Sequence, residues 1–152
     1  MASQTLNQVI KTVKDIAEAH DQINTVYFGN LVDFLSKGSE NVYPAMFYDL
    51  TGSSISGTTL TMNFSLYFMD RMVAEQTNQT EVLSDQLSIA QDIVAQLKFN
   101  AFDFAIQDNV TLTYFTEDTP DLLAGVRAEV SLDLPFTADR CQVPTNYQYP
   151  AL

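Results

Sequence analysis

The sequence predicts an α+β fold: a single two-layer domain with an antiparallel sheet of about four strands and two main helices packed on one face. Two segments carry apolar residues at helical spacing, and others carry the alternation or apolar runs typical of strands. The elements follow the order helix, strand, strand, helix, strand, strand, which suits helices laid on one side of an antiparallel sheet. We expect residues 1–135 to form this domain and residues 136–152 to form an extended C-terminal tail.

Residues 4–23 are predicted to form the first amphipathic helix. No glycine or proline interrupts the segment, and Ser3 is the expected N-cap. The charged side chains lie mostly opposite an apolar stripe, as in a helix that packs on a core through one face. That stripe consists of Leu6, Val9, Ile10, Val13, Ile16, Ala17 and Ile23.

The next segments are predicted to form an antiparallel hairpin. Residues 24–38 come first and fit either a short helix or a short strand, because short apolar runs have no decisive period. Residues 43–50 then read as a strand with Pro44 near its start. A Gly/Ser-rich stretch, 51–57, is expected to be the hairpin loop, and residues 58–69 alternate cleanly as a long half-buried strand.

Residues 79–98 are predicted to form the second main helix. Asn78 and Glu81 have the spacing of a capping box. The expected buried stripe places Leu87 on the helix opposite Phe64 on the sheet. Its members are Leu83, Leu87, Ala90, Ile93, Val94 and Leu97.

Two further strands are predicted at residues 109–116 and 124–134, where apolar and polar residues alternate. The acidic, proline-containing link between them belongs on the surface. It contains the only tight acidic cluster of the chain, Glu117, Asp118 and Asp121. A solvated turn is the ordinary interpretation of such a cluster, because calcium loops also need a glycine and further oxygen ligands.

Composition excludes several classes of function. A chain of 152 residues with 46% hydrophobic residues can build one core but not two. The net charge of −12 argues against gripping nucleic acid, which requires clustered Lys and Arg. No stretch approaches the roughly 20 apolar residues of a membrane-spanning helix.

No catalytic or cofactor motif is visible in the sequence. The single histidine, His20, has no neighbouring nucleophile and acid, so we expect it to be solvated at the end of the first helix. One cysteine, Cys141, excludes an internal disulfide and a multi-thiolate zinc site. The sequence therefore predicts a protein that is not an enzyme and has no metal and no cofactor.

The tail is a candidate docking segment. Arg140 adjoins Cys141, whose ordinary role would be that of an apolar anchor. Tyr147 and Tyr149 lie in a proline-flanked stretch that cannot bury itself. These aromatic residues either fold back on the domain or dock on a partner.

Four stretches of the chain, in order, resemble small neck-ring and tail-terminator-like proteins of tailed bacteriophages. Among these, the sequence resembles most the proteins of phages that infect Bacteroides-type bacteria, including the crAss-like group. The resemblance covers about residues 20–144. It is carried by HDQINTVYFGNLVDFLSKGSENVYPAMFYDL, TLTMNFSLYFMDR, TEVLSDQLSIAQDIVAQL and AEVSLDLPFTADRCQVP.

This resemblance implies a non-enzymatic structural virion protein. Such proteins form homo-oligomeric rings, hexamers or dodecamers, at the portal–tail junction, as a neck ring, head–tail connector or tail terminator. Their partners are further copies of themselves and neighbouring portal, connector or tail proteins, while DNA passes through without specific binding. The implied location is the neck or tail of the virion, and the host cytoplasm during assembly.

A ring around DNA gives the acidic cluster a possible role, since carboxylates lining a channel would repel the phosphates. The alternative function is that of a monomeric cytosolic α+β domain that binds a small apolar ligand.

Overall fold

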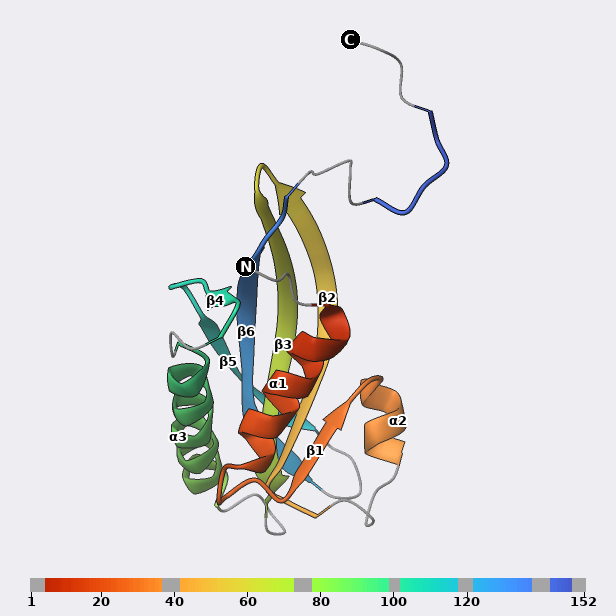
Figure 1. The fold of residues 1–152 in the computed structure, drawn as a ribbon. Coiled ribbons are helices and arrows are strands. Elements are labelled where there is room, and N and C mark those ends of the chain that lie inside the picture. Colours follow the sequence, from red (N-terminus) through yellow and green to blue (C-terminus); the bar gives the residue numbers. More distant parts are fainter. Residues whose placement is uncertain are drawn as a thin grey trace.

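The computed structural model describes residues 5–36, 42–72, 78–98, 102–117, 122–137 and 143–148. It has an α+β architecture, but the expectation of a four-stranded antiparallel sheet with two helices is wrong. The described chain contains a curled, six-stranded mixed sheet and three helices (Figure 1). In chain order the elements are α1 (Leu6–Glu18), β1 (Thr25–Phe28), α2 (Leu31–Ser36), β2 (Ala45–Ser56), β3 (Thr59–Arg71), α3 (Gln79–Leu97), β4 (Ala105–Ile106), β5 (Thr111–Glu117) and β6 (Leu123–Pro135).

The sheet has the strand order β1-β2-β3-β6-β4, and β5 also pairs with β6. All pairs are antiparallel except β1 and β2, which are parallel. A parallel pair needs a crossover connection, and α2 together with its flanking residues provides it. The short strand β4 is the one that the sequence did not predict, while β1 lies in the segment 24–38, for which a short strand was one of two alternatives.

The segment 24–38 contains both of the structures between which its sequence left a choice. Gly29, at φ +147°, ends β1 in a conformation that L side chains rarely adopt. Asn30 then begins α2, because its side-chain oxygen accepts a hydrogen bond from the Val32 amide at 2.8 Å. A four-residue strand and a six-residue helix therefore follow each other without a longer loop.

The hairpin of β2 and β3 is longer than expected, because residues 51–56 continue β2 instead of forming a loop. The two strands pair up to Ser56 and Thr59, and Gly57 at φ +60° begins a two-residue turn. A register shift between Leu50 and Gly52 bends the hairpin. Its tip extends past α1 at one end of the sheet (Figure 1).

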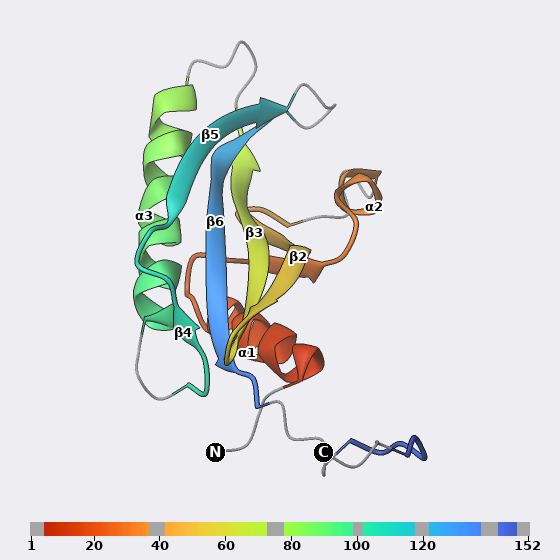
Figure 2. The same cartoon turned by 90° about the horizontal axis from the view of Figure 1, so that it is seen from above.

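Helices α1 and α3 pack on one face of the sheet, as predicted, and enclose the main core (Figures 1 and 2). On α3 the buried face differs from the expected stripe. Leu87 is only partly buried, whereas Gln86 is fully buried and its side-chain amide atoms have no hydrogen-bond partner among the described residues. The buried residues of α3 are Val82, Gln86, Ile89, Ala90, Ile93 and Leu97.

The ends of the two main helices also differ from the prediction. Thr5 is the N-cap of α1 and forms a capping box with Gln8, while Ser3 lies outside the described residues. The helix ends at Glu18. Asn78 occupies the N-cap of α3, but its side chain makes no capping hydrogen bond, so the predicted capping box is not formed.

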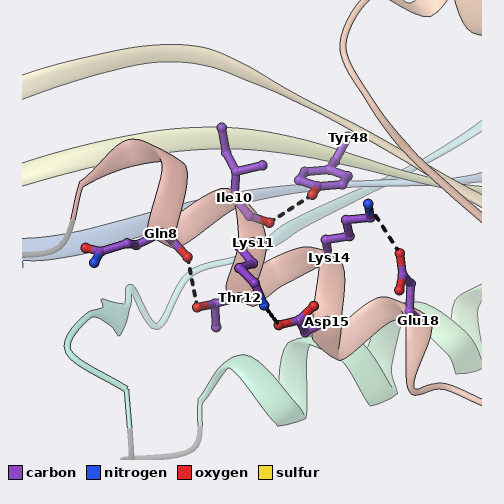
Figure 3. Close-up of polar contacts among 8 residues, drawn as sticks. All are labelled: Gln8, Ile10, Lys11, Thr12, Lys14, Asp15, Glu18 and Tyr48. Carbon is purple, nitrogen blue, oxygen red and sulfur yellow. Dashed lines mark hydrogen bonds and ion pairs between the residues drawn. The ribbon is translucent and has the colours of Figure 1, made fainter.

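A buried tyrosine ties α1 to the sheet (Figure 3). The Tyr48 hydroxyl, on β2, donates a hydrogen bond to the Ile10 carbonyl at 2.9 Å. Burial, followed by the nearby carboxylates of Glu18 and Asp15, raises the pKa of Tyr48 above its ordinary value. Lys11–Asp15, at 2.7 Å, and Lys14–Glu18, at 3.6 Å, form ion pairs along the exposed side of the helix.

Helix α2 covers part of the opposite face of the sheet, where a second, aromatic core forms. Phe34 of α2 lies 5.7 Å from the Tyr27 ring and 5.6 Å from the Phe47 ring, measured between ring centroids. The aromatic series continues across the sheet through Tyr67 to Phe115 of β5. The sheet is therefore apolar on both faces in the part that contains Phe47, Tyr67 and Phe115.

A single glycine allows the close approach of β3 and β6. Gly125 pairs with Met69, and a Cβ atom at Gly125 would lie 1.9 Å from the Phe68 carbonyl oxygen. Only glycine fits this backbone contact. The strand on the other side, β5, pairs Phe115 with the same glycine.

Candidate assembly surface

Strand β5 lies at an open edge of the sheet. It pairs with β6 on one side, and no strand of the described chain pairs with its other side. Natural edge strands are commonly protected by charges, prolines or bulges. From Thr111 to Thr116 this strand has none of these protections, and Tyr114 is 55% exposed. The outer side of β5, hereafter the β5 edge, is therefore suited to pair with another strand.

An apolar groove lies beside β5 on each face of the sheet. The groove on the α2 side has a volume of about 240 Å³ and is the more enclosed of the two. It is lined by Leu31, Leu35, Tyr67, Met69, Thr113, Phe115 and Arg127. The groove on the α3 side has a volume of about 270 Å³ and is lined by Ala90, Gln91, Val94, Ala95, Lys98, Val110 and Leu112.

Arg127 supplies the positive charge at the α2-side groove. Its guanidinium lies over the Tyr67 ring, 5.6 Å from the centroid, and pairs with Glu129 at 2.7 Å. It also donates a hydrogen bond to the Ser65 hydroxyl at 3.4 Å. Burial raises the pKa of the nearby Asp49 carboxyl, although the charge of Arg127 acts in the opposite direction.

Three exposed apolar residues lie near the other edge of the sheet, on β1, on α2 and beside the start of β1. Val32 of α2 is 72% exposed, and Phe28 and Val42 are also exposed large apolar residues. The Val42 amide donates a hydrogen bond to the Thr25 hydroxyl at 3.3 Å, which holds this residue beside β1. We call Phe28, Val32 and Val42 the β1–α2 patch.

Part of the predicted acidic cluster is described. Glu117 is the last residue of β5 and pairs with Leu123 of β6, at the sheet end remote from the hairpin tip. Asp118 and Asp121 lie outside the described residues, as do Arg140, Cys141 and Tyr149 of the tail. Tyr147 is described and is 65% exposed. Strand β6 ends at Pro135, and residues 143–148 form neither helix nor strand.

His20 is not solvated, contrary to the prediction, since its side chain is only 15% exposed. It lies in a cleft of about 770 Å³ between the end of α1 and α3. The Gln22 amide donates a hydrogen bond to Nδ1 at 3.1 Å, so Nε2 carries the proton and donates to Asp92 at 2.9 Å. The described residues that line this cleft include no Ser, Thr or Cys that could accompany the His20–Asp92 pair as a nucleophile.

Within the described ranges no three His, Cys, Asp or Glu residues are grouped as a metal site would require. The same part of the chain has no helix whose length and apolarity would allow it to cross a membrane.

The sequence analysis proposed the tail as a docking segment, which stays a prediction, and it missed the β5 edge. The alternation of Leu112 and Tyr114 with threonines predicts a strand, yet it does not reveal that the strand lies at an edge. The sequence signal that could have indicated an open edge was the absence of charged residues from Thr111 to Thr116.

No protein-family model matches this chain, and comparison with curated proteins finds no related sequence.

Proposed function

We propose that this chain is a non-enzymatic structural virion protein that assembles into a homo-oligomeric ring at the portal–tail junction of a tailed bacteriophage. A neck ring, a head–tail connector and a tail terminator are the three forms of this role. The observation that supports the proposal is that the two edges of the sheet differ, with an open strand at the β5 edge and exposed apolar residues, the β1–α2 patch, at the other. A ring requires such a pair, because each subunit presents one surface to the subunit before it and another to the subunit after it.

The charge of the chain suits a ring around DNA. A net charge of −12 repels phosphate, so a duplex can move past the protein without adhering. We assign Glu117, Asp118 and Asp121 to the channel wall, since Glu117 is the last residue of β5 and the two aspartates belong by sequence to the link between β5 and β6. Wild-type protein should therefore leave duplex DNA unretarded in a gel even at low salt, where screening is weakest. Salt-dependent binding of DNA would contradict this assignment.

The rival function, binding of a small apolar ligand by a monomer, has less support. The two apolar grooves, of about 240 and 270 Å³, are open at the surface. Binding sites for small molecules commonly measure about 300–1,000 Å³ and bury most of the ligand. The cleft at His20 has a volume of about 770 Å³, but it is lined mostly by polar and charged residues and does not suit an apolar ligand. Grooves of this kind on both sides of an open strand are better suited to a peptide segment than to an enclosed ligand.

The test of the proposed function is the native mass of the purified protein, measured together with negative-stain images. We expect a single closed assembly with a mass that is a multiple of 17.0 kDa, and ring-shaped particles. His20→Ala and Cys141→Ala should form the same assembly, because neither residue has a catalytic role in the proposal. A protein that stays at 17.0 kDa at high concentration, and also in the presence of the other neck proteins, would refute the ring.

A further inference from the structure

We infer that the β5 edge of one subunit pairs with the hairpin edge of the neighbouring subunit, as two antiparallel strands. The hairpin edge is the outer side of β2 from Gly52 to Ser56, beyond the end of β1. The inference rests on the proposed ring and names a contact between its subunits. The two edges lie on opposite sides of the sheet, so within one subunit they do not meet.

The hairpin edge is open for pairing. Strand β1 pairs with only the first four residues of β2, and Figure 1 shows β2 continuing beyond it along the outer side of the hairpin. Within the described ranges, only β3 forms backbone hydrogen bonds with residues 52–56. Residues 53–56 are exposed, Ile55 by 58%, and no residue from 50 to 69 is charged. This edge therefore lacks the charges that commonly protect an edge strand.

The hydrogen bonds of β6 show which backbone groups of β5 point outward. The Ser131 carbonyl accepts a hydrogen bond from the Gln107 amide at 2.9 Å, so Ser131 points towards β4 and away from β3. Strand β5 lies on the same side of β6 as β4, because β3 occupies the other side throughout. Directions alternate along an antiparallel ladder, so the odd-numbered residues of β6 bond Thr113 and its alternates. Leu112 and Tyr114 therefore direct their N–H and C=O groups outward.

The same alternation identifies the outward residues of β2. Ser131 lies opposite Asn63 of β3, so the Asn63 backbone also points away from β6 and towards β2. Its partner there is Gly52, and Gly52, like every second residue towards the tip, bonds β3. Ser53 and Ile55 therefore direct their N–H and C=O groups outward, towards an incoming strand.

Strand direction and sheet face agree between the two edges. Strands β2 and β5 are antiparallel within one subunit, since β2, β3, β6 and β5 follow one another through antiparallel pairs. Rotation about a ring axis preserves this relation and keeps each face of the sheet on the same side. Ile55, Leu112 and Tyr114 all lie on the face that α1 and α3 cover, because their partners on β3 and β6 pack in or against the main core. These three exposed apolar side chains therefore meet on one face of the joined sheet.

One register aligns both edges over five residue pairs. It sets Ile55 against Leu112 as an apolar pair, and two serines of the hairpin against two threonines of β5. It also sets Phe115 opposite Gly52, where an aromatic side chain covers the backbone that glycine leaves exposed. A slip by one residue would turn the matched side chains to opposite faces. The pairs are Gly52–Phe115, Ser53–Tyr114, Ser54–Thr113, Ile55–Leu112 and Ser56–Thr111.

Charge and length favour this contact between two copies. The chain carries −12, whereas neither residues 52–56 nor residues 111–115 include a charged side chain. Contact through uncharged segments limits the repulsion between two acidic subunits. The alternative partner on this side of the sheet, β1, has only four residues, and Val42 lies beside its start. The hairpin edge therefore offers the longer strand for pairing.

Disulfide trapping tests the register directly. In a Cys141→Ser background, which removes the only cysteine, Ser54→Cys and Thr113→Cys occupy a pair whose Cα atoms lie about 4.5 Å apart, within the range of a disulfide. Mild oxidation should join this double variant into a ladder of dimers, trimers and larger species on a non-reducing denaturing gel. The matched control, Ser53→Cys with Thr113→Cys, should give no ladder, because the two side chains lie on opposite faces.

Two rival contacts give different products in the same assay. A dimer as the main product of Thr113→Cys alone would overturn the inference in favour of pairing between two β5 strands. A ladder from Phe28→Cys with Tyr114→Cys, and none from the hairpin pair, would overturn it in favour of pairing between β1 and β5.

Lysine variants supply a second readout. Ile55→Lys and Tyr114→Lys should each convert the wild-type assembly to the 17.0 kDa monomer, because a charge on either edge prevents strand pairing. Gln96→Lys makes the same charge change at an exposed residue of α3 and should assemble normally. Rings that persist in both edge variants and give no disulfide ladder overturn the strand pairing alone. A ladder from chains that never form ring-shaped particles supports the pairing and refutes the ring.

Discussion

Replacing Gly125 by Ala tests whether the close approach of β3 and β6 controls the stability of the fold. The added methyl group would lie 1.9 Å from the Phe68 carbonyl oxygen and 2.9 Å from the Met69 Cα, both backbone atoms. Ordinary contacts begin at 3.4 Å, so the oxygen and the methyl group must separate by the difference, about 1.5 Å. Neither atom belongs to a flexible side chain, and the two strands themselves must therefore move.

The expected cost follows from that movement. Forcing an extra methyl group into a packed site costs about 1–3 kcal/mol. Weakening two flanking inter-strand hydrogen bonds adds about 0.5–1.5 kcal/mol for each bond. The total, roughly 2–6 kcal/mol, corresponds to a fall of about 1–3 M in the urea midpoint for a domain of this size.

The assay is urea unfolding followed by far-UV circular dichroism and tyrosine fluorescence, since the chain has no Trp. Gly52→Ala is the matched control, because a Cβ atom there meets nothing within 4 Å. That variant should be unchanged or gain about 0.4–1 kcal/mol from the lower entropy of its unfolded chain. A Gly125→Ala midpoint within a few tenths of a molar of wild type would refute the reasoning.

Three further predictions concern the core and its titrating groups. Tyr48→Phe should cost about 0.5–1.5 kcal/mol at pH 7 through the lost hydrogen bond. Because burial raises the pKa of Tyr48, wild type should lose stability as pH rises above the ordinary tyrosine value of about 10, and Tyr48→Phe should lose less over the same range. Burial also raises the pKa of Asp49, so ionisation of this carboxyl destabilises the fold when the pH is above the ordinary pKa of an aspartate. Asp49→Asn should therefore raise the melting temperature at pH 7. A gain of equal size at pH 3 would show that ionisation of Asp49 is not the cause. Finally, Ile93→Ala should cost about 2–5 kcal/mol, while Leu87→Ala, at a partly buried position, should cost clearly less in the same urea titration.

The parts of the fold that were predicted correctly are those with a strong local pattern. The stripe of α1 and the alternation of β3 extend over enough residues to identify each element. The face of α3 was wrong because Gln86, a polar residue, was left out of the stripe although it is buried. Strand β2 was ended too early because Gly52 and its serine neighbours disfavour strands, whereas pairing with β3 overrides that preference.

The candidate assembly surface was only partly predictable, for a different reason. The exposure of Tyr147 could be predicted because prolines and polar residues around it disfavour local burial. Whether Leu112 and Tyr114 are covered depends instead on which strand lies at the end of the sheet order. That order is set by long-range pairing with β6, and no local feature of the sequence encodes it.

The central position of β6 also determines how the subunit responds to mechanical force. This strand pairs with β3 along its whole length and with β4 and β5 on its other side, and the chain continues from it directly into the tail. Tension applied through the tail therefore acts along the axis of β6. Antiparallel hydrogen bonds are perpendicular to the strands, so such a pull loads them in shear, many at once, and does not open them one after another. A subunit held by its tail would thus resist extraction through the most extensively paired strand that it has.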